Sequence, residues 1–344
     1  MTELTVLHAL SRSGGTTGFY ELLEESTAPG VRIHPFSWRH ALIGSYDILH
    51  VHWPENFVRG STRGRTLLKF VATTLLLFRL ELFRTPVVRT VHNVRPHEGA
   101  TRLERVILSG LDRRTRAAVV LNPVTPVPPD RPTSLIPHGH YCDVRSFQCL
   151  EPRPKTPNSL LYFGQIRLYK GLDDLMTAYG ELDSASVSLQ IVGEPQNADL
   201  VARLTSFAEG RRRVRLCLRH VADITLSRAI TESSVVVLPY RQMHNSGALI
   251  LALSLGAVVL APQTPTTLLV QEEVGAEWVQ LFSGEHITAA DLVDALEAAA
   301  TVDVARRPRF RDRDPSVVAE RHLQVYRSVL GTQDLPAVGK DCIT

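Results

Sequence analysis

The fold is decided by residues 235–262, whose sequence is VVVLPYRQMHNSGALILALSLGAVVLAP. Two runs of apolar, mostly β-branched residues, 235–238 and 258–261, are typical of strands that are buried on both faces of a parallel sheet. Parallel neighbours need a crossover connection, and the residues between these runs are numerous enough to form one that contains a helix. The stretch therefore predicts a β–α–β unit of an α/β protein.

The helix of this unit is predicted by its end signals. Ser246 and Gly247 begin the apolar run 248–255, and Gly256 closes it. The first turn of such a helix presents N–H groups and a partial positive charge, and Gly247 lets an anion approach the backbone closely. Two interpretations are open at this point: a phosphate-binding helix start, or an ordinary β–α–β unit.

Length and composition indicate two globular domains in a reducing compartment. The chain has 344 residues, and 44% of them are apolar. Its 4 cysteines include no CxxC pair, which argues against a zinc site or a disulfide framework. The first residues lack a signal-peptide pattern, and no uncharged run approaches the roughly 20 residues of a membrane span. We therefore expect a cytoplasmic protein.

The net charge of +3 is unevenly distributed along the chain. Residues 1–150 contain 18 Lys and Arg against 12 Asp and Glu, a charge of +6, and the remainder has 20 against 23, a charge of −3. A basic first half favours an acidic partner or surface. Residues 59–89 carry seven basic residues around the apolar segment LLKFVATTLLLFRLELF. This segment predicts either a helix that lies on an anionic membrane surface or a core helix with solvated Arg ends.

Strand-like and helix-like runs alternate through both halves. In the first half, strands are predicted at 4–10, 31–36, 47–52, 87–91, 117–122 and 134–137, with a helix at 19–25. In the second half, strands are predicted at 159–163, 187–192, 214–218, 235–238 and 258–261, and helices at 172–182, 200–209, 224–232, 248–255, 267–273, 291–300 and 315–330. The Pro-rich stretch 151–158 between the halves is typical of a linker. This pattern predicts two doubly wound domains that face across a cleft.

Loops at the ends of the first-half strands carry polar residues. Residues 11–18, SRSGGTTG, do not match GxGxxG, so they are either a nucleotide-type β–α opening or a tight turn that needs only glycine. The predicted strand 47–52 runs into HVHWPENF, which contains His52, and the predicted strand 87–91 is followed by HNVRPHE, which begins with His92. Parallel order places both loops on one rim of the sheet. Each of these histidines either meets a ligand or packs structurally.

The loop GQIRLYKG at 164–171 follows one predicted strand and precedes a helix. Arg167 and Lys170 lie three residues apart, so both can converge on one anion. Arg can donate two parallel hydrogen bonds to phosphate oxygens, and Lys contributes a compact positive charge. Alone, this loop is compatible with solvated surface, but together with the helix start at Ser246 it favours a diphosphate site.

These pieces together resemble the GT-B glycosyltransferases, specifically the family 4-like group that uses nucleotide-sugar donors. The similar segments are FGQIRLYKGLDDLMTAY at 163–179, LQIVGEP at 189–195, SSVVVLPYR at 233–241 and SGALILALSLGAVVLAP at 246–262, with SGG, DILHVHWPE, TVHNVRPHE and IPHGHY in the first half. The resemblance covers nearly the whole chain. It implies two Rossmann-like domains, one that binds the acceptor at 1–150 and one that binds the donor at 159–313, and a helix at 314–330 that crosses back to the first.

The resemblance also implies roles for individual residues. Arg167 and Lys170 would neutralise the donor diphosphate, and His92 and His244 would lie near the transferred sugar, which makes these four the candidate catalytic residues. The donor-binding positions that it implies are Gly14, Gly15, Gly164, Gly193, Glu194, Val221, Asn245, Ser246, Gly247 and Ala248. Fixed cations and N–H groups stabilise the charge that gathers on the leaving group, so neither a metal nor another cofactor is expected.

The chain departs from the family where many retaining members carry two glutamates, because it has His244 and Ala252 there. An inverting enzyme would need a general base, for which Glu98, His97 and His92 are candidates.

The resulting hypothesis is a metal-independent hexosyltransferase of polysaccharide or glycoconjugate biosynthesis. Its donor would be a GDP- or UDP-sugar, its acceptor a glycan or a lipid-linked glycan, and residues 59–89 would contact the inner face of the cell membrane. The alternatives are a nucleotide-sugar epimerase of the same fold and a non-catalytic binding subunit. No nucleic-acid partner is expected.

Overall fold

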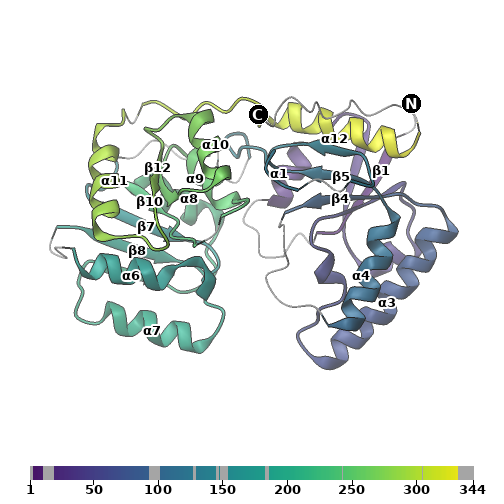
Figure 1. Ribbon diagram of the computed structural model, residues 1–344, viewed down its shortest axis with the longest axis horizontal. Helices are drawn as coiled ribbons and strands as arrows, with labels where there is room; N and C mark the ends of the chain where they lie inside the picture. The colour runs from purple at the N-terminus through teal and green to yellow at the C-terminus, as the bar shows by residue number, and fades with distance from the viewer. Residues whose placement is uncertain are drawn as a thin grey trace. The chain divides into compact units, whose positions relative to one another are not determined.

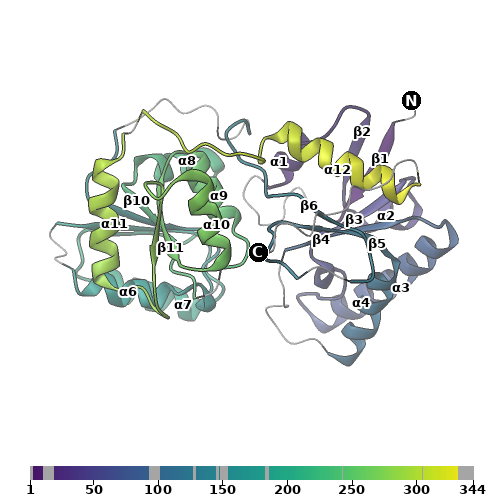
Figure 2. The same ribbon diagram turned by 45° about the horizontal axis from the view of Figure 1, so that its top comes forward.

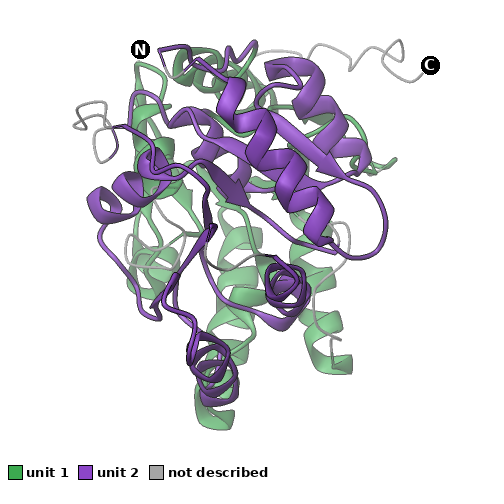
Figure 3. Cartoon of the chain, turned by 90° about the vertical axis from the view of Figure 1, so that its left-hand side faces the viewer, with its two compact units in different colours: residues 1–139, 312–344 green, residues 140–311 purple. Residues whose placement is uncertain are grey.

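The computed structural model describes residues 3–10, 19–92, 101–126, 129–144, 147, 154–182, 186–241, 243–303 and 305–331. The chain divides into two compact units (Figure 3). Unit 1 comprises residues 1–139 and 312–344, and unit 2 comprises residues 140–311. The chain thus passes between the units just before the Pro-rich stretch that predicts the linker, and it returns to unit 1 ahead of its last helix.

The sheet of unit 1 has six parallel strands in the order β2-β1-β3-β4-β5-β6. Its strands are β1 (Leu4–His8), β2 (Val31–Pro35), β3 (Ile48–Val51), β4 (Val87–Val91), β5 (Thr115–Val120) and β6 (Thr133–Leu135). Its helices are α1 (Phe19–Glu25), α2 (Trp38–Ile43), the 3₁₀ turn η1 (Pro54–Phe57), α3 (Arg63–Leu82), α4 (Arg102–Arg114) and α12 (Pro315–Val329).

Helices cover both faces of this sheet, so the strands are apolar on both sides. Val6 and Ile48 pack toward Val325 of α12, whereas the next residues along the same strands, Leu7 and Leu49, pack toward α3 and α4. Figures 1 and 2 show α12 along one face and α3 with α4 along the other. The α12 helix therefore completes the core of unit 1, although the whole of unit 2 precedes it in the sequence.

The sheet of unit 2 is also parallel and six-stranded, in the order β12-β11-β10-β7-β8-β9. Its strands are β7 (Ser159–Phe163), β8 (Ser188–Val192), β9 (Val214–Cys217), β10 (Val235–Val237), β11 (Val258–Pro262) and β12 (Val279–Phe282). Its helices are the 3₁₀ turn η2 (Leu168–Lys170), α6 (Leu172–Gly180), α7 (Ala198–Ala208), α8 (Asp223–Glu232), α9 (Gly247–Ser254), α10 (Pro265–Val274) and α11 (Ala289–Thr301).

Two doubly wound parallel sheets confirm the predicted α/β class. The predicted elements are present, with ends that differ by a few residues. Five elements were not predicted from the sequence, namely α2, α4, β12 and the short 3₁₀ turns η1 and η2. Within the part of the chain that the structure describes, no helix is long and apolar enough to cross a membrane.

Candidate active site

The strand order of unit 2 reverses between β7 and β10. From β7 the chain continues to β8 and β9 on one side, and it then returns to β10 on the other side. Open α/β sheets bind ligands outside the carboxyl ends of the strands at such a reversal. The two loops at this position are 164–171, after β7, and 238–246, after β10, and both contain predicted site residues.

Glycines let these loops approach each other closely. Gly193, which follows β8, has φ +156°, and a Cβ there would lie 1.8 Å from the carbonyl oxygen of Gly164. Gly171 has φ +69°, and a Cβ there would lie 1.8 Å from the carbonyl oxygen of Pro239. A side chain at either position would collide with backbone, so the loops after β7, β8 and β10 need glycine to meet.

Lys170 lies where these loops converge. Its Nζ is 5.1 Å from the centre of the Tyr240 ring, on the loop after β10, which is a cation–π distance. Its Nζ also lies over Gly164, at 3.9 Å from where a Cβ would be. Burial, and next the nearby charge of Arg167, lower the pKa of Lys170 to about 8. Both causes disfavour the charged form of Lys170, and an anion bound at this loop would offset them.

The neighbouring Arg241 is neutralised by protein groups. Its Nε and Nη2 donate to the two carboxylate oxygens of Asp174 at 3.0 and 3.1 Å. His286 Nδ1 lies 3.2 Å from the same carboxylate. Hydrogen bonds from Arg241 and His286 hold the pKa of Asp174 below its usual value, against the opposing effect of its partial burial. This cluster fixes the start of α6 to the loop after β10.

Helix α9 begins at Gly247, as the end signals predict. Ser246 caps it, because its Oγ accepts a hydrogen bond from Leu249 N at 3.2 Å. The loop before the cap is anchored by Thr264 and Thr266, whose hydroxyls donate to the carbonyl oxygen of Met243 at 3.1 and 2.9 Å. The first N–H groups of an α-helix have no intrahelical acceptor, so α9 presents them at the carboxyl edge of the sheet.

The other predicted residues of unit 2 occupy the same edge. Glu194 is exposed, and its carbonyl oxygen accepts from Ile166 N at 3.0 Å, which joins it to the Arg167 loop. His244 and Asn245 are half-buried before α9, and burial lowers the pKa of His244. Val221 is half-buried after β9, the edge strand, and is therefore the most peripheral of the set.

In unit 1, His92 directly follows β4. Its ring stacks on Trp53 with 4.3 Å between centres, and its Nε2 lies 3.1 Å from His52 Nδ1. Burial, then the nearby His138, lower the pKa of His92 to about 3, so the ring is neutral near pH 7. The predicted residues Gly14, Gly15, His97 and Glu98 lie outside the described residues.

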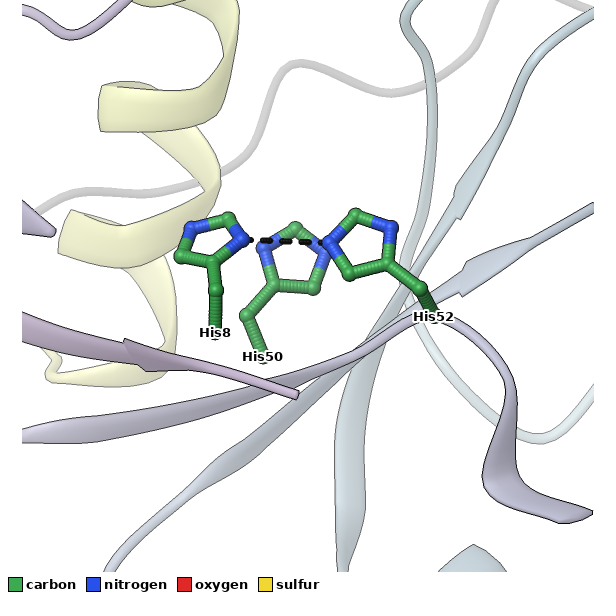
Figure 4. A group of neighbouring side chains, drawn as sticks. All are labelled: His8, His50 and His52. Atoms are coloured by element: carbon green, nitrogen blue, oxygen red, sulfur yellow. Dashed lines mark hydrogen bonds between the residues drawn. The ribbon is translucent and has the colours of Figure 1, made fainter. Parts of the chain in front are cut away.

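A buried histidine group next to His92 contains His52, which the sequence offers as a candidate, together with His8 and His50, which were not predicted as site residues. It comprises His8 at the end of β1, His50 in β3 and His52 just after β3, and Figure 4 shows the three rings side by side. His50 and His52 are two residues apart and so lie on one face of the strand. The HVH pattern at a strand end was the available signal, but the contribution of β1 depends on strand order.

Known proteins resemble this chain in sequence and in fold. Residues 157–301 match the family model described as Glycosyl transferases group 1. Sucrose-phosphate synthase from Thermosynechococcus elongatus has a TM-score of 0.60 at 16% identity, with 96% of this chain and 100% of that chain covered. Anabaena HepE in complex with UDP-glucose has a TM-score of 0.59 at 14% identity, with 96% and 99% covered. These structures show that the chain has the GT-B fold, and the family match shows a glycosyltransferase domain within unit 2.

A closer likeness is found among proteins of known activity. GDP-mannose:glycolipid 4-beta-D-mannosyltransferase from Xanthomonas campestris pv. campestris is 37% identical over 330 residues, which cover 96% of this chain and 93% of that protein. The chain belongs to the family of this mannosyltransferase and is therefore a glycosyltransferase of GT-B fold.

Proposed function

We propose that the chain transfers a mannosyl group from GDP-mannose to a glycolipid and forms a β-linkage. The observation that carries this proposal is the 37% identity with a GDP-mannose:glycolipid 4-beta-D-mannosyltransferase over 96% of the chain. The aligned length includes most of both units, so it covers the diphosphate-binding loops of unit 2 as well as the histidine loops of unit 1.

The residues of unit 2 suit the departure of GDP. The acceptor hydroxyl attacks the anomeric carbon as the bond to the diphosphate oxygen breaks, and negative charge gathers on the leaving GDP. Arg167, Lys170 and the start of α9 supply positive charge and N–H donors for that oxygen. Since these groups provide the compensating charge, we propose that the reaction needs no metal.

The stereochemistry requires a base. GDP-mannose carries its sugar in the α configuration, so a β product means inversion by direct attack of the acceptor. Inverting transfer uses a general base to take the proton of the attacking hydroxyl. Among the described residues we assign this role to His92, which is neutral near pH 7 and follows β4 at the carboxyl edge of its sheet.

Donor use is tested with purified protein. Calorimetric titration with GDP and with UDP, in the presence of EDTA, should show tighter binding of GDP. Incubation with radiolabelled GDP-mannose and a glycolipid extract should yield a labelled lipid that β-mannosidase releases. If GDP-mannose is not turned over although other nucleotide sugars are, the donor is wrong. Release of free GDP without any acceptor would indicate an epimerase, and binding without turnover a non-catalytic subunit.

We further propose that α3 contacts the membrane that contains the glycolipid. One side of α3 packs into the core through Thr73, Leu76 and Leu80. The opposite side has an apolar stripe at spacings of three and four residues, in which every side chain is more than half exposed: Leu68, Val71, Leu75, Phe78 and Leu82. Leu103 and Val106 of the neighbouring α4 are exposed as well.

Basic residues surround this apolar stripe. Arg63 and Arg65 are exposed at the start of α3, and Arg102 and Arg105 are exposed on α4. An apolar helix face bordered by cations suits an anionic lipid surface, where the apolar side chains enter the boundary of the headgroups and the cations meet lipid phosphates.

Vesicle sedimentation tests this contact. The native chain should sediment with phosphatidylglycerol vesicles and much less with phosphatidylcholine vesicles. The double variant Leu75→Glu/Phe78→Glu should remain in the supernatant. Val293→Glu, at a partly exposed apolar position on α11 of unit 2, is the matched control and should sediment like the native chain. Equal sedimentation of the native chain and the double variant would contradict the proposal.

A further inference from the structure

The histidines of unit 1 form one continuous chain of hydrogen-bond distances that reaches from His92 to the last helix. His92 Nε2 lies 3.1 Å from His52 Nδ1, and His52 Nε2 lies 3.1 Å from His8 Nδ1. His8 Nε2 lies 3.2 Å from the Tyr326 hydroxyl of α12. We call His92, His52, His8 and Tyr326 the histidine chain.

Two further contacts extend the hydrogen-bond distances beyond Tyr326. The Tyr326 hydroxyl also lies 2.8 Å from His50 Nδ1, and His50 Nε2 lies 2.8 Å from Thr90 Oγ1. The rings of His8, His50 and His52 and the Tyr326 side chain are almost completely buried. These groups are thus shielded from bulk solvent, and the hydrogen-bond distances between them couple the tautomer of each ring to that of its neighbour.

Every link in this series can pair one donor with one acceptor. A neutral imidazole carries one N–H and one bare nitrogen, and a phenol can donate one hydrogen bond while it accepts another. If His92 donates from Nε2 to His52, then His52 donates to His8, His8 donates to Tyr326 and Tyr326 donates to His50. In that direction Nδ1 of His92 is bare, which is the state that a base requires.

Burial keeps these rings neutral. It lowers the pKa of His8 to about 3 and the pKa values of His50 and His52 well below their ordinary value. Among the described residues, the other titratable groups that the pKa shifts place against the rings are His322 on α12 and His138 after β6, and Arg313 faces His138. None of these neighbours is an acid, so a positive charge confined to one ring would be costly.

A metal ion is a second reading of the same group. One nitrogen from each of His8, His50 and His52 lies within 4.8 Å of the others. However, the group that meets this criterion among the described residues contains only imidazoles, so none of its three members is a carboxylate that would offset the charge of a buried dication. The facing nitrogens of His8 and His52 are also already at hydrogen-bond distance. Hydrogen bonding therefore accounts for the geometry better than ligation does.

We propose that His52, His8 and Tyr326 are positioning residues that fix the tautomer of His92 and share the proton that His92 takes from the acceptor hydroxyl. This inference rests on the proposed function, in which His92 is the base. It gives α12 a functional role through Tyr326, in addition to the part of the core that this helix supplies.

The proton transfer balances in each step. The acceptor hydroxyl gives its proton to His92 Nδ1 as its oxygen bonds to the anomeric carbon, and the electron pair of the broken bond leaves on GDP. His92 passes its Nε2 proton to His52 Nδ1, and His52 passes its Nε2 proton to His8 Nδ1. The positive charge is spread over several rings instead of being held on one. After the products leave, the reverse transfers return the proton to His92, where water takes it up.

The variant Tyr326→Phe tests this role, because it removes only the hydroxyl that joins two links. Tyr46→Phe is the matched control, since Tyr46 is a buried tyrosine of the same unit whose hydroxyl donates to the Ala41 carbonyl oxygen at 2.8 Å. Tyr326→Phe should lower kcat by about tenfold or more while KM for GDP-mannose stays within about twofold. Tyr46→Phe should leave both parameters unchanged. A kcat for Tyr326→Phe equal to that of Tyr46→Phe would overturn the inference.

A second measurement does not depend on activity. In protein labelled with ¹⁵N-histidine, His92 should show one tautomer near pH 7.5, with the proton on Nε2, and Tyr326→Phe should produce a mixture of both. A wild-type spectrum in which His92 carries its proton on Nδ1 would overturn the proposal. Stoichiometric zinc binding that abolishes the bonds between rings would also overturn it, in favour of a metal site. An inactive wild-type enzyme with the expected tautomer would instead count against the proposed function alone.

Discussion

The buried histidines should make unit 1 labile in mild acid. His8, His50 and His52 have pKa values far below 6.5 in the folded chain because of burial, whereas the unfolded chain has ordinary values near 6.5. The unfolded state therefore binds more protons below about pH 6.5, and the free energy of unfolding falls as the pH falls. Stability that depends on these rings is fully present above about pH 7.5.

The size of the effect follows from the pKa difference. At about pH 5.5, one unit below the unfolded pKa, each histidine that stays neutral in the fold destabilises it by about 1.4 kcal/mol. The three fully buried rings together give about 4 kcal/mol, which is a large part of the 5–15 kcal/mol typical of a domain. For a unit of this size, that corresponds to a fall of roughly 10 °C in Tm.

Hydrogen exchange followed by mass spectrometry measures this unit by unit. After correction for the intrinsic exchange rate, peptides from β1 and β3 should lose protection between about pH 7.5 and 5.5, while peptides from β7 and β10 should change little. His50→Gln should make the free energy of unfolding less dependent on pH, because the unfolded state then takes up about one proton fewer. If the protection of β1 and β3 is the same at both pH values, the neutral buried state of these rings is refuted.

Three further substitutions address unit 2. Lys170→Met should weaken GDP binding about 10- to 100-fold, because hydrogen bonds to charged groups contribute about 1.5–3 kcal/mol. The native chain should also bind GDP less tightly above about pH 8, where Lys170 loses its proton. In calorimetry, Lys170→Met should remove this pH dependence. Gly193→Ala places a Cβ at 1.8 Å from the Gly164 carbonyl oxygen, so we expect a Tm lower by several degrees and at least about tenfold weaker GDP binding. Gly210→Ala is the control, because Gly210 is also at positive φ but has no atom near the added Cβ. It should lower only the Tm. Ser246→Ala removes the cap of α9 and should cost about 1 kcal/mol in urea unfolding, with Ser246→Asn restoring it; an unchanged midpoint for Ser246→Ala would show that the cap is not stabilising.

The parallel sheets were predictable because their strands are buried on both faces. Runs such as 235–238 and 160–163 are continuous and apolar, which strands with one solvated face are not. The helix α4 was missed because Leu103 and Val106 point outward among arginines and hide its amphipathic pattern. Its capping box, Thr101 with Glu104, was a readable signal for its start.

The sequence indicated those contacts of the site whose residues are close together in the sequence. Arg167 and Lys170 lie in one loop, so their spacing alone suggested a shared anion. Lys170 and Tyr240 meet only because β7 and β10 are neighbours in the sheet, which local spacing does not reveal. The histidine chain was harder still to predict, because Tyr326 and His8 are separated by 318 positions in the sequence.

The return of the chain to unit 1 has a consequence for synthesis on the ribosome. One face of the unit 1 sheet is covered by Val318, Val325 and Tyr326, which are translated after the whole of unit 2. While unit 2 emerges as an unbroken segment that can fold at once, the strands of unit 1 wait with that apolar face uncovered. An apolar face that stays uncovered during synthesis can associate with other chains, so we expect the N-terminal half to be prone to aggregation until α12 has been made.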